Sequence, residues 1–126
     1  ASDHAPHSVL EKEVEFELAA NGISGLETSL GVALWLVRQN LLSMADLIER
    51  MSLAPARILG LSSGLHSGGA ADVTIIDPDD PWTVVAADFY SLGKNTPFEG
   101  WELPGRAVMT IVGGSIVFDG FAPGKD

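Results

Sequence analysis

The pattern of apolar residues changes once, near residue 61, and this change most limits the folds available to the chain. Before it, apolar residues recur at helical spacing, whereas after it short β-branched runs alternate with turn residues. With 126 residues and 46% apolar side chains, the chain can bury a core. We therefore predict a helical first part and a β-rich second part of the α/β class, each incomplete by itself, which suggests a piece of a larger protein.

Three helices are expected in the first part. Residues 28–40 are apolar on nearly all sides, which is typical of a buried helix. Ser43 and Asp46 approximate a capping box and predict the start of a second helix. Pro55 suits the first turn of a third helix, and Gly60 suits the position where that helix ends.

The acidic stretch before these helices allows two interpretations. Residues 11–18 alternate glutamates with Val14, Phe16 and Leu18. This alternation favours a half-buried extended segment, and a loop with a solvated acidic face explains it equally well. The pair Asn21-Gly22 then marks a turn, because both residues tolerate positive φ.

The second part is expected to form strands. Residues 73–76 and 82–85 are short runs rich in β-branched and aromatic residues. Residues 106–118 form two alternating runs joined by Gly113-Gly114, a pair that supplies the positive φ values of a tight hairpin turn. A β-hairpin over residues 106–118 is the clearest expectation for the whole chain.

Charge and composition exclude several classes of function. Seven basic residues against 17 acidic ones give a net charge of −10, which disfavours nucleic acid as a partner. The absence of cysteine excludes a disulfide scaffold, a thiolate zinc site and a cysteine nucleophile. Apolar runs are also far shorter than the roughly 20 residues that a bilayer requires, so no membrane span is expected.

The first residues carry the chain's densest group of metal- and proton-handling side chains. Asp3, His4 and His7 lie within five residues, in a segment that Pro6 stiffens. A catalytic zinc takes about three protein ligands, and three neighbours on one stiff segment cannot easily face one ion. The residues alone therefore allow a polar loop at least as readily as a site.

Five blocks, in order and covering essentially the whole chain, resemble those of the dihydroorotases, a family of metal-dependent cyclic amidohydrolases. They are SDHAPH (2–7), GISGLET (22–28), PARILGL (55–61), Gly68 with ADV (71–73), and NTPFEGW (95–101) followed by GRAV (105–108). The last block is close to a signature of dihydroorotases in particular.

The resemblance implies a fold and a reaction. Residues 1–60 would be the end of a (β/α)8 barrel, and residues 61–126 would belong to an accompanying small β-sandwich, as the C-terminal portion of the parent protein. Barrel enzymes keep their chemistry at the C-terminal mouth of the strands. The reaction would be the reversible hydrolysis of dihydroorotate to N-carbamoyl-L-aspartate in pyrimidine biosynthesis, in the cytoplasm.

The resemblance also assigns roles to individual residues. Asp3 matches an aspartate that contacts the metal and acts as a general base, moving a proton from metal-bound water to the leaving amide nitrogen. His7 matches a histidine that binds the substrate carboxylate. The backbone of Ala20, Asn21 and Gly22 matches a loop that holds the pyrimidine ring, although the family often has Pro-Phe in place of Ala20-Asn21. A structural hydrogen-bonding role is expected for His4.

Most of the metal ligands that the resemblance implies have no counterpart in this sequence. One or two zinc ions would be held mainly by histidines and a bridging group upstream, so the chain alone should be inactive and unstable. Expected partners are the missing N-terminal part of the same protein, the substrate, and a second copy or aspartate transcarbamoylase. Two alternatives stay open: a non-catalytic scaffold for aspartate transcarbamoylase, and another cyclic amidohydrolase such as an allantoinase or hydantoinase.

Overall fold

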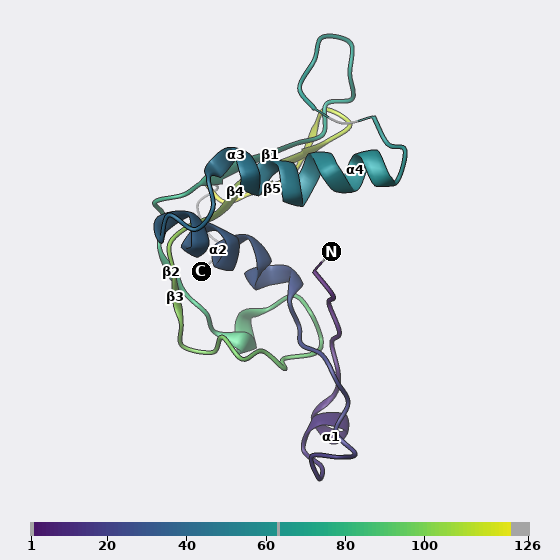
Figure 1. Cartoon of the computed structure of the whole chain (residues 1–126), viewed down its shortest axis with the longest axis vertical. Coiled ribbons are helices and arrows are strands. Elements are labelled where there is room, and N and C mark those ends of the chain that lie inside the picture. The colour runs from purple at the N-terminus through teal and green to yellow at the C-terminus, as the bar shows by residue number, and fades with distance from the viewer. Residues whose placement is uncertain (1, 63, 122–126) are drawn as a thin grey trace.

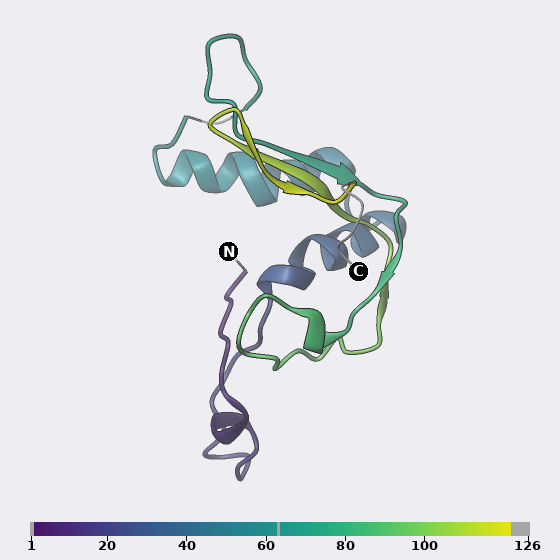
Figure 2. The ribbon, with the colours of Figure 1, turned by 180° about the vertical axis from the view of Figure 1, so that it is seen from behind.

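A computed structural model describes residues 2–62 and 64–121, which form a mixed arrangement of helices and strands (Figure 1). Ala1 and, in the predicted second part, residues 63 and 122–126 lie outside the described residues. The α1 segment projects at one end of the molecule, the three longest strands lie toward the other end, and α2 lies between them (Figures 1 and 2). Within the described residues, no helix combines the length and the apolar character needed to cross a bilayer.

Helices occupy the first part, as the sequence predicts. They are α1 (Val9–Lys12), α2 (Leu26–Arg38), α3 (Met44–Ile48), a π-helical turn (Glu49–Leu53) and α4 (Ala54–Ile58). The expected capping box is confirmed, since the Ser43 hydroxyl accepts the Asp46 N–H at 3.1 Å and the Asp46 carboxylate accepts the Ser43 N–H at 3.3 Å. Pro55 lies in the first turn of α4, where its missing N–H costs no hydrogen bond.

Helix α2 is buried on one side only. Thr28, Gly31 and Leu34 are buried, whereas Leu26 is 58% exposed and Trp35 is 39% exposed. The prediction of a helix buried all round is therefore wrong for the described chain. The apolar residues of the other side have too few neighbours here to cover them.

Residues 11–18 do not form the extended segment that alternation favoured. The chain makes the short helix α1 and then bends and turns, with Phe16 95% exposed. The loop with a solvated acidic face is the confirmed alternative. Ser8 explains the short helix, because its N–H and hydroxyl both donate to the Glu11 carboxylate.

The predicted hairpin is confirmed. Strands β4 (Arg106–Val112) and β5 (Ser115–Asp119) pair antiparallel across Gly113 and Gly114, whose φ angles are +56° and +81°. Two consecutive positive φ values allow the turn to follow the twist of the strands. Strand β1 (Val73–Asp77) pairs antiparallel with β4, so the sheet order is β1-β4-β5.

The buried hydrophobic cluster lies around a second, two-stranded sheet. This sheet pairs β2 (Trp82–Thr83) with β3 (Glu102–Leu103), and a 3-10 turn (Ala86–Asp88) follows β2. The expected strand over residues 82–85 is thus confirmed for its first two residues only. Val84, Phe89 and Leu103 form the buried cluster, and Val32 of α2 packs against it.

Candidate functional site

Residues 2–7 form the first segment of the chain, which lies beside the start of α2. His4 and Ile23 form a parallel bridge, and the Ala5 N–H donates to the Ile23 carbonyl at 2.7 Å. The His4 Nδ1 atom accepts the N–H groups of Gly25 and Leu26, each at 3.2 Å. These are groups at a helix start that have no partner within the helix. The expectation of a structural hydrogen-bonding role for His4 is confirmed.

Asp3 lies one residue before this bridge, with its side chain exposed. Its φ of +46° lies in the left-handed region, which aspartate tolerates better than most residues with a side chain. Among the described residues, none forms a hydrogen bond or ion pair with its carboxylate. The carboxylate is therefore accessible to an incoming group.

His7 contacts the loop of Ala20, Asn21 and Gly22. Its Nε2 atom lies 2.9 Å from the Asn21 carbonyl oxygen, and its Nδ1 atom lies 3.8 Å from a carboxylate oxygen of Glu11. Because a carbonyl only accepts, Nε2 must carry the proton in this contact. The pKa of Glu11 lies below its usual range, because the Ser8 backbone N–H and then its hydroxyl donate to the carboxylate, with His7 adding a smaller effect.

The loop of Ala20, Asn21 and Gly22 is tied down through its carbonyl groups. The Lys12 ammonium donates to the Ala20 carbonyl at 2.7 Å and to the Gly22 carbonyl at 3.1 Å. With the Asn21 carbonyl on His7, all three carbonyls are engaged within the chain. The Ala20 N–H donates to the Glu11 backbone carbonyl. Of the loop's three N–H groups, those of Asn21 and Gly22 have no hydrogen-bond acceptor among the described residues.

Two residues that shape this region received no role from sequence reasoning, Lys12 and Asn95. Asn95 donates to the carbonyls of Ala5 and Gly22 and accepts the His7 N–H. Asn95 lies in a block that carries the resemblance, and that was the available signal. Their contacts could not be read from spacing, because Asn95 reaches residues that are 73 to 90 positions away.

A small cavity opens beside this cluster. Its volume is about 210 Å³, and it is lined by His7, Ser8, Val9, Lys12, Glu13, Leu92, Lys94 and Asn95. Its wall carries two lysines and a histidine beside Glu13, and both ammonium groups already donate to backbone carbonyls of the chain.

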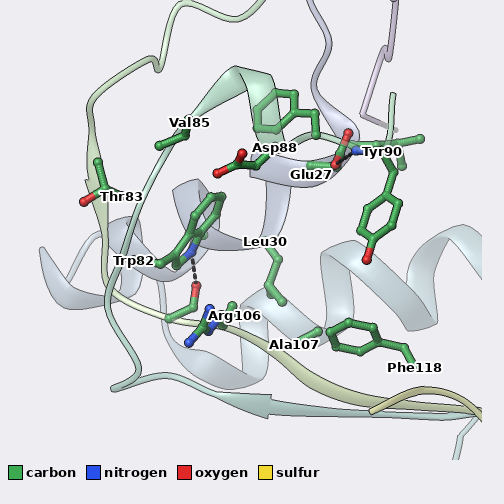
Figure 3. Close-up of a pocket in the computed structure, with 14 residues that line it drawn as sticks. Glu27, Leu30, Trp82, Thr83, Val85, Asp88, Tyr90, Arg106, Ala107 and Phe118 are labelled. Atoms are coloured by element: carbon green, nitrogen blue, oxygen red, sulfur yellow. Dashed lines mark hydrogen bonds between the residues drawn. The ribbon is translucent and has the colours of Figure 1, made fainter. Parts of the chain in front are cut away.

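A larger cavity of about 940 Å³ lies elsewhere, between α2, the β2–β3 ribbon and the hairpin (Figure 3). Its wall contains none of the site residues expected from sequence, so its size does not make it the functional site. The Trp82 indole N–H donates to the Gly105 carbonyl at 3.1 Å there. Arg106 pairs with Asp80 at 2.6 Å.

The described residues do not form a metal centre by themselves. No three of their histidine, aspartate and glutamate side chains come together, and His4 and His7 each use a ring nitrogen in a contact within the chain. Asp3 is the remaining candidate ligand of the first segment. A complete metal site would need donors from outside the described residues.

Curated proteins and solved structures are similar to most of this chain. No protein-family profile matches it. Among curated proteins, it is 55% identical over 119 residues to a dihydroorotase of Pelobacter propionicus and 51% identical over 118 residues to one of Syntrophus aciditrophicus. These matches cover 94% and 93% of this chain, and 28% of each relative.

Solved structures give a related result. The chain superposes on the L-hydantoinase (dihydropyrimidinase) of Arthrobacter aurescens with a TM-score of 0.77 and 38% identity, covering 82% of this chain and 24% of that one. It superposes on a D-hydantoinase (dihydropyrimidinase) of Thermus sp. with a TM-score of 0.79 and 25% identity, covering 98% and 29%. Over nearly all of its length the sequence is therefore similar to dihydroorotases, and it spans a little over a quarter of the length of those relatives.

Proposed function

We propose that this chain is part of a dihydroorotase, which hydrolyses the cyclic amide of dihydroorotate reversibly to N-carbamoyl-L-aspartate. The observation that carries the proposal is the juxtaposition of His7 with Asn21, 14 positions apart in sequence and 2.9 Å apart in space. Both are positions to which the resemblance gives substrate contacts. The match to curated dihydroorotases over 94% of the chain supports the same conclusion.

The proposed architecture assigns residues 1–60 to the end of a (β/α)8 barrel and residues 61–126 to a small β-sandwich, at the C-terminal end of the complete protein. The likeness to two hydantoinase structures supports an amidohydrolase scaffold. The upstream part would supply most ligands of one or two zinc ions, with Asp3 as the ligand from this chain. A second copy or aspartate transcarbamoylase would be the protein partner, in the cytoplasm.

The residues of this chain divide the chemistry among them. Asp3, exposed and without a partner among the described residues, would take a proton from the attacking water and return it to the leaving amide nitrogen. His7 would donate to the substrate carboxylate by exchanging its Nε2–H contact from the Asn21 carbonyl to the ligand. The N–H groups of Asn21 and Gly22 would donate to the ring, because neither has an acceptor among the described residues.

The decisive experiment is a chimaera in which this chain replaces the matching 28% of the Pelobacter propionicus dihydroorotase. We expect zinc-dependent hydrolysis of dihydroorotate. Asp3→Asn should lower kcat at least about 100-fold, the usual scale of a lost general base. Glu102→Gln is the matched control, an acid-to-amide change on the exposed face of β3, and should retain activity.

Other outcomes would identify the alternatives. A folded, metal-loaded chimaera that hydrolyses hydantoin or allantoin but not dihydroorotate would show another cyclic amidohydrolase. A folded chimaera that hydrolyses none of them, yet binds aspartate transcarbamoylase, would show a scaffold. Either result would contradict the dihydroorotase proposal.

A further inference from the structure

We propose that Asn95 is a positioning residue that holds His7 and the Gly22 loop in the arrangement needed to bind substrate. Its Oδ1 atom accepts the His7 N–H at 3.1 Å and the Ser24 hydroxyl at 2.9 Å. Its Nδ2 atom donates to the Ala5 carbonyl at 3.1 Å and to the Gly22 carbonyl at 3.2 Å. One side chain thus hydrogen-bonds both the first segment of the chain and the loop of Ala20, Asn21 and Gly22.

The chemistry of the site calls for an amide. A carboxamide offers two N–H donors and a carbonyl oxygen with two lone pairs, and all four are used at Asn95. Aspartate has the same shape and keeps the two acceptor contacts, but it cannot donate to the two carbonyls. It would also place negative charge against those carbonyl oxygens. Glutamine keeps every donor and acceptor but displaces them by one methylene group.

The backbone around Asn95 is packed to hold this position. Its backbone carbonyl accepts the Ser24 N–H at 2.9 Å, and the single Ser24 O–H is shared between Asn95 Oδ1 at 2.9 Å and the Gly93 carbonyl at 2.6 Å. Ser24 is 1% exposed. A Cβ at Gly93 would lie 2.6 Å from Pro6, so the segment before Asn95 lies directly against the first segment. Asn95 is therefore held from both sides and can hold its partners in turn.

Lys12 tethers the same loop but cannot replace Asn95. Its ammonium reaches Gly22 and Ala20 through a long flexible side chain, and its contacts do not include His7. Asn95 is the residue whose side chain touches both His7 and Gly22. Loss of Asn95 should therefore separate the two halves of the binding site even while Lys12 remains in place.

The inference rests on the proposed function and is tested in the same chimaera. Asn95→Asp should raise the KM for dihydroorotate by at least about tenfold, the effect of losing one or two hydrogen bonds in the binding arrangement. The kcat should change less than about threefold, because none of the four contacts involves Asp3. Asn40→Asp is the matched control: Asn40 is exposed at the end of α2, and its φ of +57° suits aspartate too.

A second measurement needs no activity. Hydrogen exchange of Asn95→Ala, which removes the acceptor of the His7 N–H, should show lost protection at the His7 amide, with segments remote from this cluster and the Asn40→Asp variant unchanged. If the unsubstituted chimaera is inactive on dihydroorotate, the proposed function fails, and this exchange result still decides whether Asn95 holds the two segments together.

Three outcomes would overturn the inference. The first is an unchanged KM in a folded Asn95→Asp chimaera that hydrolyses dihydroorotate. The second is unchanged protection of the His7 amide in Asn95→Ala. The third is global unfolding of both Asn95→Asp and the milder Asn95→Gln, which would show that Asn95 supports the whole fold rather than the site.

Discussion

Gly22 shows at the scale of one residue why the loop of residues 20–22 needs a glycine. Its φ of +107° is rarely adopted by residues with a side chain, and a Cβ there would lie 2.5 Å from the Ala5 Cβ. Gly22→Ala should therefore push the loop away from the first segment, raise the KM of the chimaera for dihydroorotate, and cost about 1–3 kcal/mol of stability.

Gly60 provides the control for this prediction. Its φ is +67°, and a Cβ there would meet nothing within 4 Å. Gly60→Ala should cost about 1–2 kcal/mol through backbone strain alone and leave the KM unchanged. Steady-state kinetics and thermal unfolding of both variants separate the effects, and an equal KM for both would contradict the prediction.

At the same scale, the roles of His7 and residues 20–22 stay predictions from the resemblance, and the structure adds that His7 contacts the Asn21 carbonyl. The part played by Asn95 was not predictable, since a hydrogen bond between residues 71 to 90 positions apart leaves no periodic trace in a single sequence.

Among the elements, the helix caps make part of the protein's stability depend on pH. The pKa of Asp46 lies below its usual range, because the Ser43 hydroxyl and then its backbone N–H donate to the carboxylate. A lowered folded-state pKa means that this contribution to stability is complete above the ordinary carboxyl range, about pH 4, and is lost as pH falls through the folded-state value. Ser43→Ala should raise the pKa of Asp46 toward its ordinary value.

Side-chain carboxyl chemical shifts followed through a pH titration measure this change directly. Glu11 and its cap residue Ser8 lie on a separate helix, so the titration of Glu11 should be unaffected by Ser43→Ala. An Asp46 titration that is the same with and without the Ser43 hydroxyl would contradict the assigned cause.

The approach of α2 to β3 gives a second prediction for the elements. A Cβ at Gly31 would lie 2.7 Å from Leu103 Cδ1, and Leu103 is fully buried. Alanine is the better helix former, yet overpacking should dominate here, so Gly31→Ala should destabilise the protein by about 1–3 kcal/mol. Adding Leu103→Val should recover part of the loss, and a higher thermal midpoint for Gly31→Ala alone would contradict the argument.

Elements with local signals were predictable, and those without were not. The hairpin follows from two glycines between alternating runs, and α3 follows from its capping box. The alternation at residues 14–18 suggested a strand, but no neighbouring strand pairs with it, and an unpaired segment gains nothing from alternating. The pairing of β2 with β3 depends on partners about 20 positions apart and was missed for that reason.

For the whole molecule, the surface area is the feature that matters most. The chain exposes 8859 Å², whereas a compact monomer of 13.2 kDa exposes about 6,400 Å². Large apolar side chains are exposed on the α1 segment, on one side of α2 and on the hairpin. Such a surface favours association with another chain or another part of the same protein.

We therefore expect the 126-residue chain alone to associate and to melt without a sharp transition, as the sequence also suggests. Sedimentation velocity and thermal melting followed by circular dichroism test this. The chimaera, in which the relative's upstream part is present, should stay monodisperse and melt cooperatively at the same concentration. A monomeric isolated chain with one steep transition would contradict the expectation.

The loop of residues 20–22 also affects the chemical stability of the protein during storage. Among the described residues, the Gly22 N–H has no hydrogen-bond acceptor. Gly22 also has no side chain that would shield its nitrogen from the exposed Asn21 carboxamide. Attack of this nitrogen on the Asn21 side chain releases ammonia and closes a succinimide, which opens with water to aspartate or isoaspartate. Isoaspartate lengthens the backbone by one carbon and would carry the Asn21 carbonyl away from His7. Deamidation at this one bond would thus alter the contact between residue 21 and His7 over time while leaving the rest of the chain intact.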